Sequence, residues 1–311
     1  MRSPSYIEAP TASSRRTPRV ARILVSLPML DGCLDALAGH ELVAGDPGSD
    51  AEADGLICGP MQPVDAATIE RMAQLRVIAV AGAGSDAIDD AAVRARGIEV
   101  VTAGEALVET TADLAFALIL AASRLMHDAE AKLRDGGWEG WRYVEPRFGR
   151  DVHGARLGLV GFGRIARAVA RRAAGFDMDV IHHTRTPTGE AGWTADLDEL
   201  LRASDIVSLH VPLSESTRRL LDARRIGLMT PTAVLVNTAR GAVVDEEALA
   251  DALTEGRLFA AGLDVYDGEP AVAPSLLAAP RTVLLPHVGS ATRRTREAML
   301  RVAAEKLSRT L

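Results

Sequence analysis

Short apolar runs alternate with amphipathic segments along most of the 311 residues, and this alternation limits the fold more than any other feature. A first series of five strand-like runs occupies residues 22–27, 41–44, 55–58, 76–81 and 98–103. Segments such as VDAATIERMA and DAIDDAAVRARG lie between some of these runs and have the spacing of helices that bury one face. The first third of the chain therefore predicts a parallel sheet with helices on both faces.

A second series begins after a long apolar helix at residues 105–124 and a connection that contains Gly and Trp. Six strands in such a series make one doubly wound nucleotide-binding sheet. The last helix, from residue 290 to the C-terminus, has no place left in that sheet, so we expect it to return to the first domain. The six strand-like runs occupy residues 156–161, 179–184, 205–211, 232–239, 258–266 and 282–288.

These patterns predict an α/β protein with two doubly wound parallel-sheet domains, and the chain is long enough for both. Residues 104–289 would form a Rossmann dinucleotide-binding domain. A smaller, discontinuous, flavodoxin-like domain would combine residues 20–103 with residues 290–311. Residues 1–19, rich in Ser, Pro and Arg, predict a disordered tail.

Composition and charge argue against several classes of protein. The net charge is −7 and the basic residues are scattered, which disfavours a nucleic-acid surface. The longest unbroken apolar run, residues 114–122, is too short to cross a bilayer, so no membrane span is expected. Cys33 and Cys58 fit buried thiols in a reducing cytoplasm better than a disulfide framework or a metal cluster. The seven histidines show no ligand spacing, so no metal is expected.

The pair Arg15-Arg16 could begin a twin-arginine export signal. The apolar segment that follows is short and fits the first strand of a domain instead. A cytoplasmic protein is therefore expected.

The segment GFGRIA, residues 161–166, follows the strand-like RLGLV and opens a helical pattern. In a dinucleotide-binding fold, Gly161 would make the tight turn and Gly163 would let backbone amides approach the pyrophosphate. Ala166 is a small residue that allows close packing of helix and strand. A strand-to-helix turn without a ligand is the alternative, but the strand–turn–helix context favours a cofactor.

The next strand indicates which cofactor binds. An NAD site needs an acid at the carboxyl end of this strand, whereas Asp177 and Asp179 lie at its start. Its far end continues through Thr184, Arg185 and Thr186, and a guanidinium with flanking hydroxyls suits a 2′-phosphate. We expect NADP(H) to be preferred, with NAD(H) possible; a solvated loop arginine is the alternative.

Functional groups follow three successive strands of the second series: Arg240, Glu269 and His287. Asp264 is a further polar residue within an apolar strand. Each has a simple structural interpretation, as a surface charge, a turn residue before proline or a capped histidine. Ligands in such sheets bind outside the carboxyl ends of the strands, so the three together favour a catalytic site.

The segments LVNTARGAVVDEEAL, GLDVYDGEP and LPHVGSAT carry these residues. They resemble the signature segments of the D-isomer-specific 2-hydroxyacid dehydrogenases, and within that family the chain is most similar to the glyoxylate/hydroxypyruvate reductase and 2-ketogluconate reductase branch. VETTADLAFALILAASR, GRDVHGARLGLVGFGRIARAVARR and HVPLSESTRRLL support this placement. The similarity extends from about residue 54 to about residue 300.

The resemblance implies a role for each polar residue. Arg240 would bind the carboxylate of a 2-oxo acid and polarise its carbonyl, His287 would be the acid/base, and Glu269 would hydrogen-bond to His287. Asp264 would face the nicotinamide carboxamide or steady that pair. Gly241 would keep the neighbouring backbone slim beside cofactor and substrate.

The resemblance also implies binding residues in both domains and a homodimer formed mainly through the nucleotide-binding domains. The backbone of Ala81, Gly82 and Ala83 would join Arg240 and His287 in binding substrate. The expected cofactor-binding residues are Gly161, Phe162, Gly163, Arg164, Ile165, Thr184, Arg185, Thr186, Val211, Pro212, Thr238, Ala239, Asp264 and Gly289.

The mechanism implied is hydride delivery to the carbonyl carbon of a short 2-oxo acid, forming the D-2-hydroxy acid. Arg240 would stabilise the charge that develops on the carbonyl oxygen, and protonated His287 would donate a proton to it. The chain departs from the family pattern at Ala87, at residues 58–65 and at residues 102–109, all in the substrate domain. Whether glyoxylate, hydroxypyruvate, 2-ketogluconate or a bulkier acid is preferred is therefore left open.

Two other functions remain as alternatives. A short-type 3-phosphoglycerate dehydrogenase would need additional cations for the phosphate. A nucleotide-sensing interaction protein, such as a transcriptional corepressor, would not need Arg240, Glu269 and His287 together.

Overall fold

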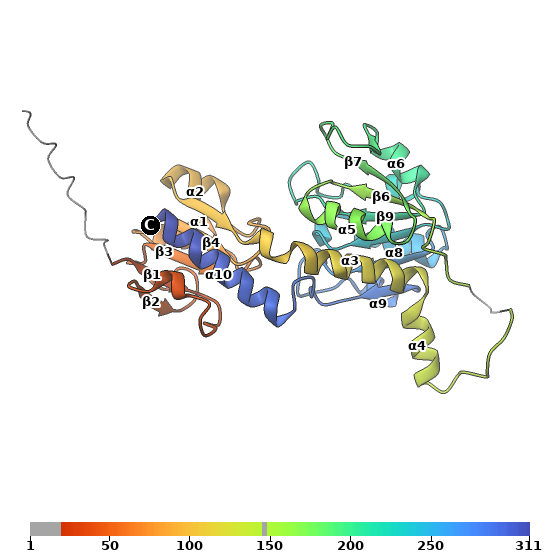
Figure 1. Cartoon of the computed structure of the whole chain (residues 1–311), viewed down its shortest axis with the longest axis horizontal. Helices are drawn as coiled ribbons and strands as arrows, with labels where there is room; N and C mark the ends of the chain where they lie inside the picture. Colours follow the sequence, from red (N-terminus) through yellow and green to blue (C-terminus); the bar gives the residue numbers. More distant parts are fainter. Residues whose placement is uncertain (1–19, 145–147) are drawn as a thin grey trace, which may run out of the picture.

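The computed structural model describes residues 20–144 and 148–311, and the expectations for residues 1–19 lie outside these ranges. Two α/β domains lie side by side, with a long helix running from one toward the other (Figure 1). Each domain has one parallel sheet, and the prediction of two doubly wound parallel-sheet domains is confirmed.

The smaller sheet has five parallel strands in the order β2-β1-β3-β4-β5, which is the flavodoxin-like order. Its helices begin where the sequence supplies a side-chain cap: Asp65 accepts from the amide of Thr68, and Asp89 from that of Ala92. The strands are Arg22–Val25, Glu41–Ala44, Gly55–Cys58, Val77–Val80 and Glu99–Thr102, and the helices are η1 (Asp35–Leu37), α1 (Ala66–Arg71) and α2 (Asp90–Arg96).

The larger sheet has seven parallel strands in the order β12-β11-β10-β9-β6-β7-β8. The six-strand prediction for this sheet was wrong by one edge strand. β8 (Trp193–Thr194) is only two residues long and pairs with the end of β7, so no apolar run marks it in the sequence. The other strands are β6 (Arg156–Val160), β7 (Asp179–His183), β9 (Ile206–Leu209), β10 (Val234–Asn237), β11 (Ala260–Leu263) and β12 (Thr282–Leu284).

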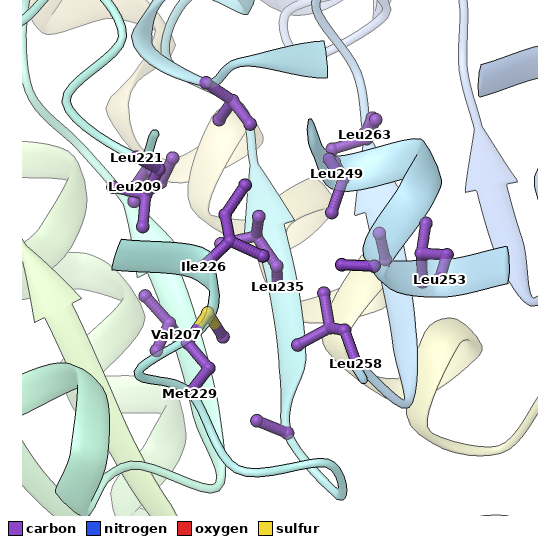
Figure 2. Close-up of a cluster of buried hydrophobic side chains, with 14 of the residues drawn as sticks. Val207, Leu209, Leu221, Ile226, Met229, Leu235, Leu249, Leu253, Leu258 and Leu263 are labelled. Atoms are coloured by element: carbon purple, nitrogen blue, oxygen red, sulfur yellow. The ribbon is translucent and has the colours of Figure 1, made fainter. Parts of the chain in front are cut away.

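Helices cover both faces of the larger sheet, as its almost uninterrupted apolar strands require. On one face, Leu249 and Leu253 of α8 pack against strand residues such as Leu235 (Figure 2). The helices of this domain are η2 (Gly104–Leu107), α3 (Val108–Ser123), α4 (Met126–Arg134), α5 (Arg164–Ala174), α6 (Leu197–Ala203), α7 (Ala223–Ile226), η3 (Gly241–Val243), α8 (Glu246–Thr254) and α9 (Pro274–Ala278).

The segment Gly104–Ser123 is long and apolar enough to cross a membrane by length and composition. Half of its most apolar stretch is buried in the protein, and α3 packs on β10, β11 and α5. This is the packing of a core helix, which uses its apolar surface inside the larger domain.

The C-terminal helix α10 (Arg293–Thr310) leaves the larger sheet and lies across the smaller one (Figure 1). Its residues Met299, Ala303 and Leu307 belong to the same buried cluster as Ile23 and Val77. The chain therefore crosses between the domains twice, at η2 and again just before α10. Residues next to both crossings line the cleft that is described below.

Candidate active site

A cleft of about 270 Å³ lies between the two sheets and receives residues from both domains. The larger domain supplies the carboxyl ends of its strands and the start of α5, as expected for a doubly wound sheet. The lining residues are Pro60, Gly82, Ala83, Gly84, Asp86, Gly104, Leu107, Val108, Thr111, Gly163, Arg164, Ile165, Ala166, His210, Val211, Pro212, Thr238, Ala239, Arg240, Asp264, His287, Gly289, Ser290 and Met299.

The glycine-rich turn has the geometry of a phosphate site. Gly161 has φ +89°, and a Cβ there would lie 2.5 Å from the carbonyl oxygen of His210, so only glycine fits. A Cβ on Gly163 would meet nothing within 4 Å, because that position opens into the cleft. Gly163 caps α5 without a side-chain hydrogen bond, so the first amides of the helix remain free for an anion.

A second observation supports a bound cofactor in this cleft. The hydroxyl of Thr238 is buried and has no hydrogen-bond partner in the described part of the chain. It lines the cleft directly after β10. Buried hydroxyls rarely lack a partner, so this donor fits a polar group of a ligand.

Asn237 and Gly241 bring Arg240 to the cleft. Asn237 ends β10, donates to the carbonyl of Arg240 at 2.9 Å and accepts from the amide of Ala239 at 3.0 Å. A Cβ on Gly241 would lie 1.8 Å from the carbonyl carbon of Tyr266. Gly241 is therefore required because the backbone after β11 crosses it, rather than because cofactor or substrate does, which corrects the role expected for it.

The guanidinium of Arg240 pairs with Asp86 of the smaller domain. Nη2 of Arg240 lies 2.9 Å from Oδ1 of Asp86, and the two side chains are 19% and 27% exposed. Burial acts to raise the pKa of Asp86, but the hydrogen bonds and charge of Arg240 outweigh it and lower that pKa below its ordinary value. Asp86 therefore stays ionised and holds the arginine across the cleft.

His287 and Glu269 form a hydrogen-bonded pair. Nδ1 of His287 lies 2.7 Å from Oε2 of Glu269, whose Oε1 accepts from the amide of Tyr266 at 3.0 Å. With Nδ1 engaged, Nε2 is the ring nitrogen free for a ligand in the cleft. An imidazole oriented by a carboxylate in this way can act in proton transfer.

Asp264 holds the turn that carries His287. Its buried carboxylate accepts from the amides of Val288 at 2.7 Å and Gly289 at 2.8 Å. Burial raises the pKa of Asp264, and these two amides partly offset that effect. His287 has φ +54°, which is uncommon for a residue with a side chain and is sustained by this turn.

Three groups of expected binding residues lie outside the lining of the cleft. The first group is Ala81, whose amide donates to the carbonyl of Cys58 at 2.8 Å. It is not free for a substrate carboxylate, which corrects that expectation. Gly82 and Ala83, by contrast, line the cleft, and their amides make no hydrogen bond in the described part of the chain. Gly161 and Phe162 belong to the glycine-rich turn but do not line the cleft, and Phe162 stacks on His182 at 3.7 Å between ring centroids.

The third group, Thr184, Arg185 and Thr186, follows β7. The hydroxyl of Thr184 donates to the carbonyl of Thr186 at 2.7 Å and accepts from the indole nitrogen of Trp193 at 3.1 Å. Arg185 is exposed and has no hydrogen bond or ion pair within the described residues. Within the described residues, the guanidinium of Arg185 and the hydroxyl of Thr186 are thus the side-chain groups of this set left free for a ligand.

The sequence reasoning missed several residues of the cleft. Thr111 interrupts the apolar helix α3, and Ser290 lies within the signature segment LPHVGSAT that carries His287, so both could have been noticed in the sequence. Asp86 was missed because a single acid in a loop is common, and His210 because it lies inside the strand-like run at residues 205–211. Burial lowers the pKa of His210 to about 4, so its imidazole is neutral near pH 7.

The family comparison agrees with this geometry. The model of the NAD-binding domain of D-isomer specific 2-hydroxyacid dehydrogenases matches residues 116–289. The chain belongs to this family. It is therefore an oxidoreductase that uses a nicotinamide dinucleotide.

Similar proteins cover both domains. A glyoxylate reductase of Thermococcus litoralis is 42% identical over 265 residues, which cover 82% of this chain and 80% of that protein. A solved structure from Thermus thermophilus is 44% identical, has a TM-score of 0.84, and covers 92% of this chain and 95% of its own.

An NADPH-dependent glyoxylate/hydroxypyruvate reductase from Sinorhizobium meliloti has been solved with NADP and malonate. It is 34% identical with a TM-score of 0.82, and the match covers 92% of each chain. Both domains of the present chain therefore have the same fold as these solved relatives.

Proposed function

We propose that the protein reduces a short 2-oxo acid, glyoxylate or hydroxypyruvate, to the D-2-hydroxy acid. The observation that carries this proposal is the convergence of Arg240 and the His287–Glu269 pair on one cleft with the glycine-rich turn of α5. The names of the relatives, glyoxylate reductase and glyoxylate/hydroxypyruvate reductase, support the choice of substrate.

The residues of the cleft divide the chemistry among them. When bound, the reduced nicotinamide supplies the hydride. Arg240 and the free amides of Gly82 and Ala83 bind the substrate carboxylate from opposite domains, which orients the carbonyl. Nε2 of His287 donates the proton to the carbonyl oxygen, and Glu269 holds the imidazole in the orientation that allows it.

The first experiment is an assay of the purified protein with glyoxylate, hydroxypyruvate, pyruvate, 2-ketogluconate and 3-phosphohydroxypyruvate, each with NADPH and with NADH. We expect the highest kcat/KM with glyoxylate or hydroxypyruvate, and a D-2-hydroxy acid as product in a chiral assay. The phosphorylated acid is expected to be poor, since Arg164 and Arg240 are the only Lys or Arg residues among the described cleft-lining residues. Tight NADPH binding without oxidation by any 2-oxo acid would instead favour a sensing protein.

NADPH is proposed as the preferred cofactor. Arg185 is free after β7, where a 2′-phosphate would lie, and Asp179 at the other end of β7 is hydrogen-bonded to Arg156 at 2.7 Å. We expect Arg185→Ser to raise the KM for NADPH roughly tenfold and leave that for NADH unchanged, as expected for loss of a charge-assisted contact. Arg202→Ser, an exposed arginine on α6, is the matched control.

A homodimer in the cytoplasm is also proposed. The segment after α4 projects from the body of the larger domain (Figure 1) and exposes Trp138, Trp141 and Tyr143, with Trp141 80% exposed. Exposed aromatic side chains of this kind are typical of subunit interfaces. Light scattering should give twice the 32.9 kDa chain mass, and Trp141→Ser with Tyr143→Ser should shift it toward the monomer.

A further inference from the structure

The guanidinium of Arg240 rests on a segment of the smaller domain, not on its own domain alone. Nε of Arg240 lies 3.1 Å from Oδ1 and 3.0 Å from Oδ2 of Asp86, and Nη2 lies 2.9 Å from Oδ1. The two residues are 154 positions apart in the sequence. Planar, multiply bonded Arg–carboxylate pairs fix the orientation of the guanidinium as well as its position.

Gly84 provides the space for this contact. A Cβ added to Gly84 would lie 1.9 Å from Nη2 of Arg240 and 2.6 Å from Oδ1 of Asp86. Gly84 is not in the left-handed region, so the constraint is the close approach of the guanidinium to the bare backbone. Any side chain at this position would separate Arg240 from Asp86.

The pairing decides which part of the guanidinium a substrate can reach. Arginine has five N–H donors. Asp86 accepts from Nε and from one N–H of Nη2, and the carbonyl of Ala239 accepts from Nη1 at 2.7 Å. One N–H on Nη1 and one on Nη2 are therefore left, and they form a fixed edge for a carboxylate or carbonyl oxygen.

We propose that Gly84 and Asp86 form a seat for the guanidinium, and that Asp86 is a positioning residue that aims Arg240 at the substrate. This inference rests on the proposed function and deepens it. The seat belongs to the smaller domain and Arg240 to the larger, so the arginine is aimed only when the two domains are closed on one another. Closure of the cleft thereby completes the substrate site.

The charge of Asp86 also reaches the proposed acid. The charged and titratable groups that face His287 are Glu269, Asp264, Asp86 and Arg240. Burial acts to raise the pKa of Asp86, and Arg240 and then His287 lower it, so Asp86 stays ionised beside both groups.

The test compares Asp86→Asn with Asp90→Asn, which makes the same chemical change in the first turn of α2, outside the cleft lining. We expect Asp86→Asn to lower kcat/KM for the 2-oxo acid by roughly 10- to 100-fold, the usual effect of losing a hydrogen bond to a charged group. The Kd for NADPH should stay within about twofold of wild type, and Asp90→Asn should stay within about twofold in all parameters. Loss of NADPH binding together with activity would contradict a positioning role.

A second measurement does not depend on turnover. Phenylglyoxal modifies accessible guanidiniums, and peptide mass spectrometry can follow Arg240 alone. We expect Arg240 to react faster in Asp86→Asn and in Gly84→Ala than in wild type or Asp90→Asn, because the seat is lost. Equal rates in all four proteins would overturn the seat. If wild type reduces no 2-oxo acid, the proposed function fails, and these rates alone decide whether the seat exists.

Discussion

The two sides of the cleft are built from the same kind of structure, a parallel sheet, but they contribute different chemistry. The larger domain presents side chains at the ends of its strands, with Arg240 after β10 and His287 after β12. The smaller domain presents mainly backbone, through Gly82, Ala83 and Gly84, with Asp86 as its charged group. The proposed reaction uses groups from both sides, so under this proposal it occurs only where the two domains meet at the cleft.

The largest effect should come from the side-chain half of the cleft. His287→Ala removes the proposed proton donor, and we expect kcat to fall by roughly 10²- to 10⁴-fold, the usual contribution of general acid catalysis. Isothermal titration should show that NADPH binding is retained. Near-normal turnover of this variant would show that a group other than His287 donates the proton. The larger domain would then not supply the acid, contrary to the comparison above.

The next largest effect concerns the free energy of unfolding and involves His210, which follows β9 on the larger domain's side of the cleft. The folded pKa of His210 is about 4, below the usual value near 6.5. Between these values the unfolded chain takes up a proton that the folded chain does not, so stability falls as pH falls from about 6.5 to 4, by about 3 kcal/mol.

The variant His210→Asn should lose this dependence. Urea unfolding of both proteins at several pH values between 7 and 4.5, without cofactor, measures the difference in slope. Identical pH dependence in the two proteins would mean that His210 is not buried in its neutral form.

A smaller effect compares one glycine from each side. A Cβ on Gly241 would collide with the backbone of Tyr266, at 1.8 Å, whereas a Cβ on Gly82 would meet the side chain of Pro60, at 2.6 Å. We expect Gly241→Ala to destabilise the protein by about 1–3 kcal/mol and to reduce turnover, since Arg240 and the segment of Glu269 must move apart.

The expected cost of Gly82→Ala is lower, because a proline ring at a loop can shift more easily than two crossing backbones. Chemical unfolding and kcat for the two variants give the comparison. If Gly82→Ala lost more stability than Gly241→Ala, the smaller domain's side of the cleft would be the more rigid of the two, contrary to this prediction.

Much of the fold could be predicted from local pattern. Apolar runs of strand length, caps such as Asp65 and Asp89, and the Gly161–Gly163 turn are decided by residues close in sequence. The strand β8 was missed because two residues carry no period, and it forms only by pairing with β7. The division into residues 20–103 with 290–311 and residues 104–289 remains our proposal, to which the packing of α10 on the smaller sheet lends support.

The candidate site was accessible to the sequence only in part. Arg240, Glu269 and His287 stand out because each is a polar group after an apolar strand. Asp86 could not be found in this way, since its importance lies in a contact with a residue 154 positions away. The same holds for Ala81, whose amide is used by Cys58 on the neighbouring strand β3.

The sequence by itself determined the strand and helix order, the glycine turn and the chemical groups that each strand delivers, because these follow from periodicity and from single residues. Only the tertiary structure decided how those groups meet. The backbone of Tyr266 passes so close to Gly241 that no side chain fits there. Asp264 holds the turn of His287, and Asp86 orients Arg240. The physical reason is that distance and direction between side chains on different strands depend on the packing of two whole domains, which no local pattern encodes.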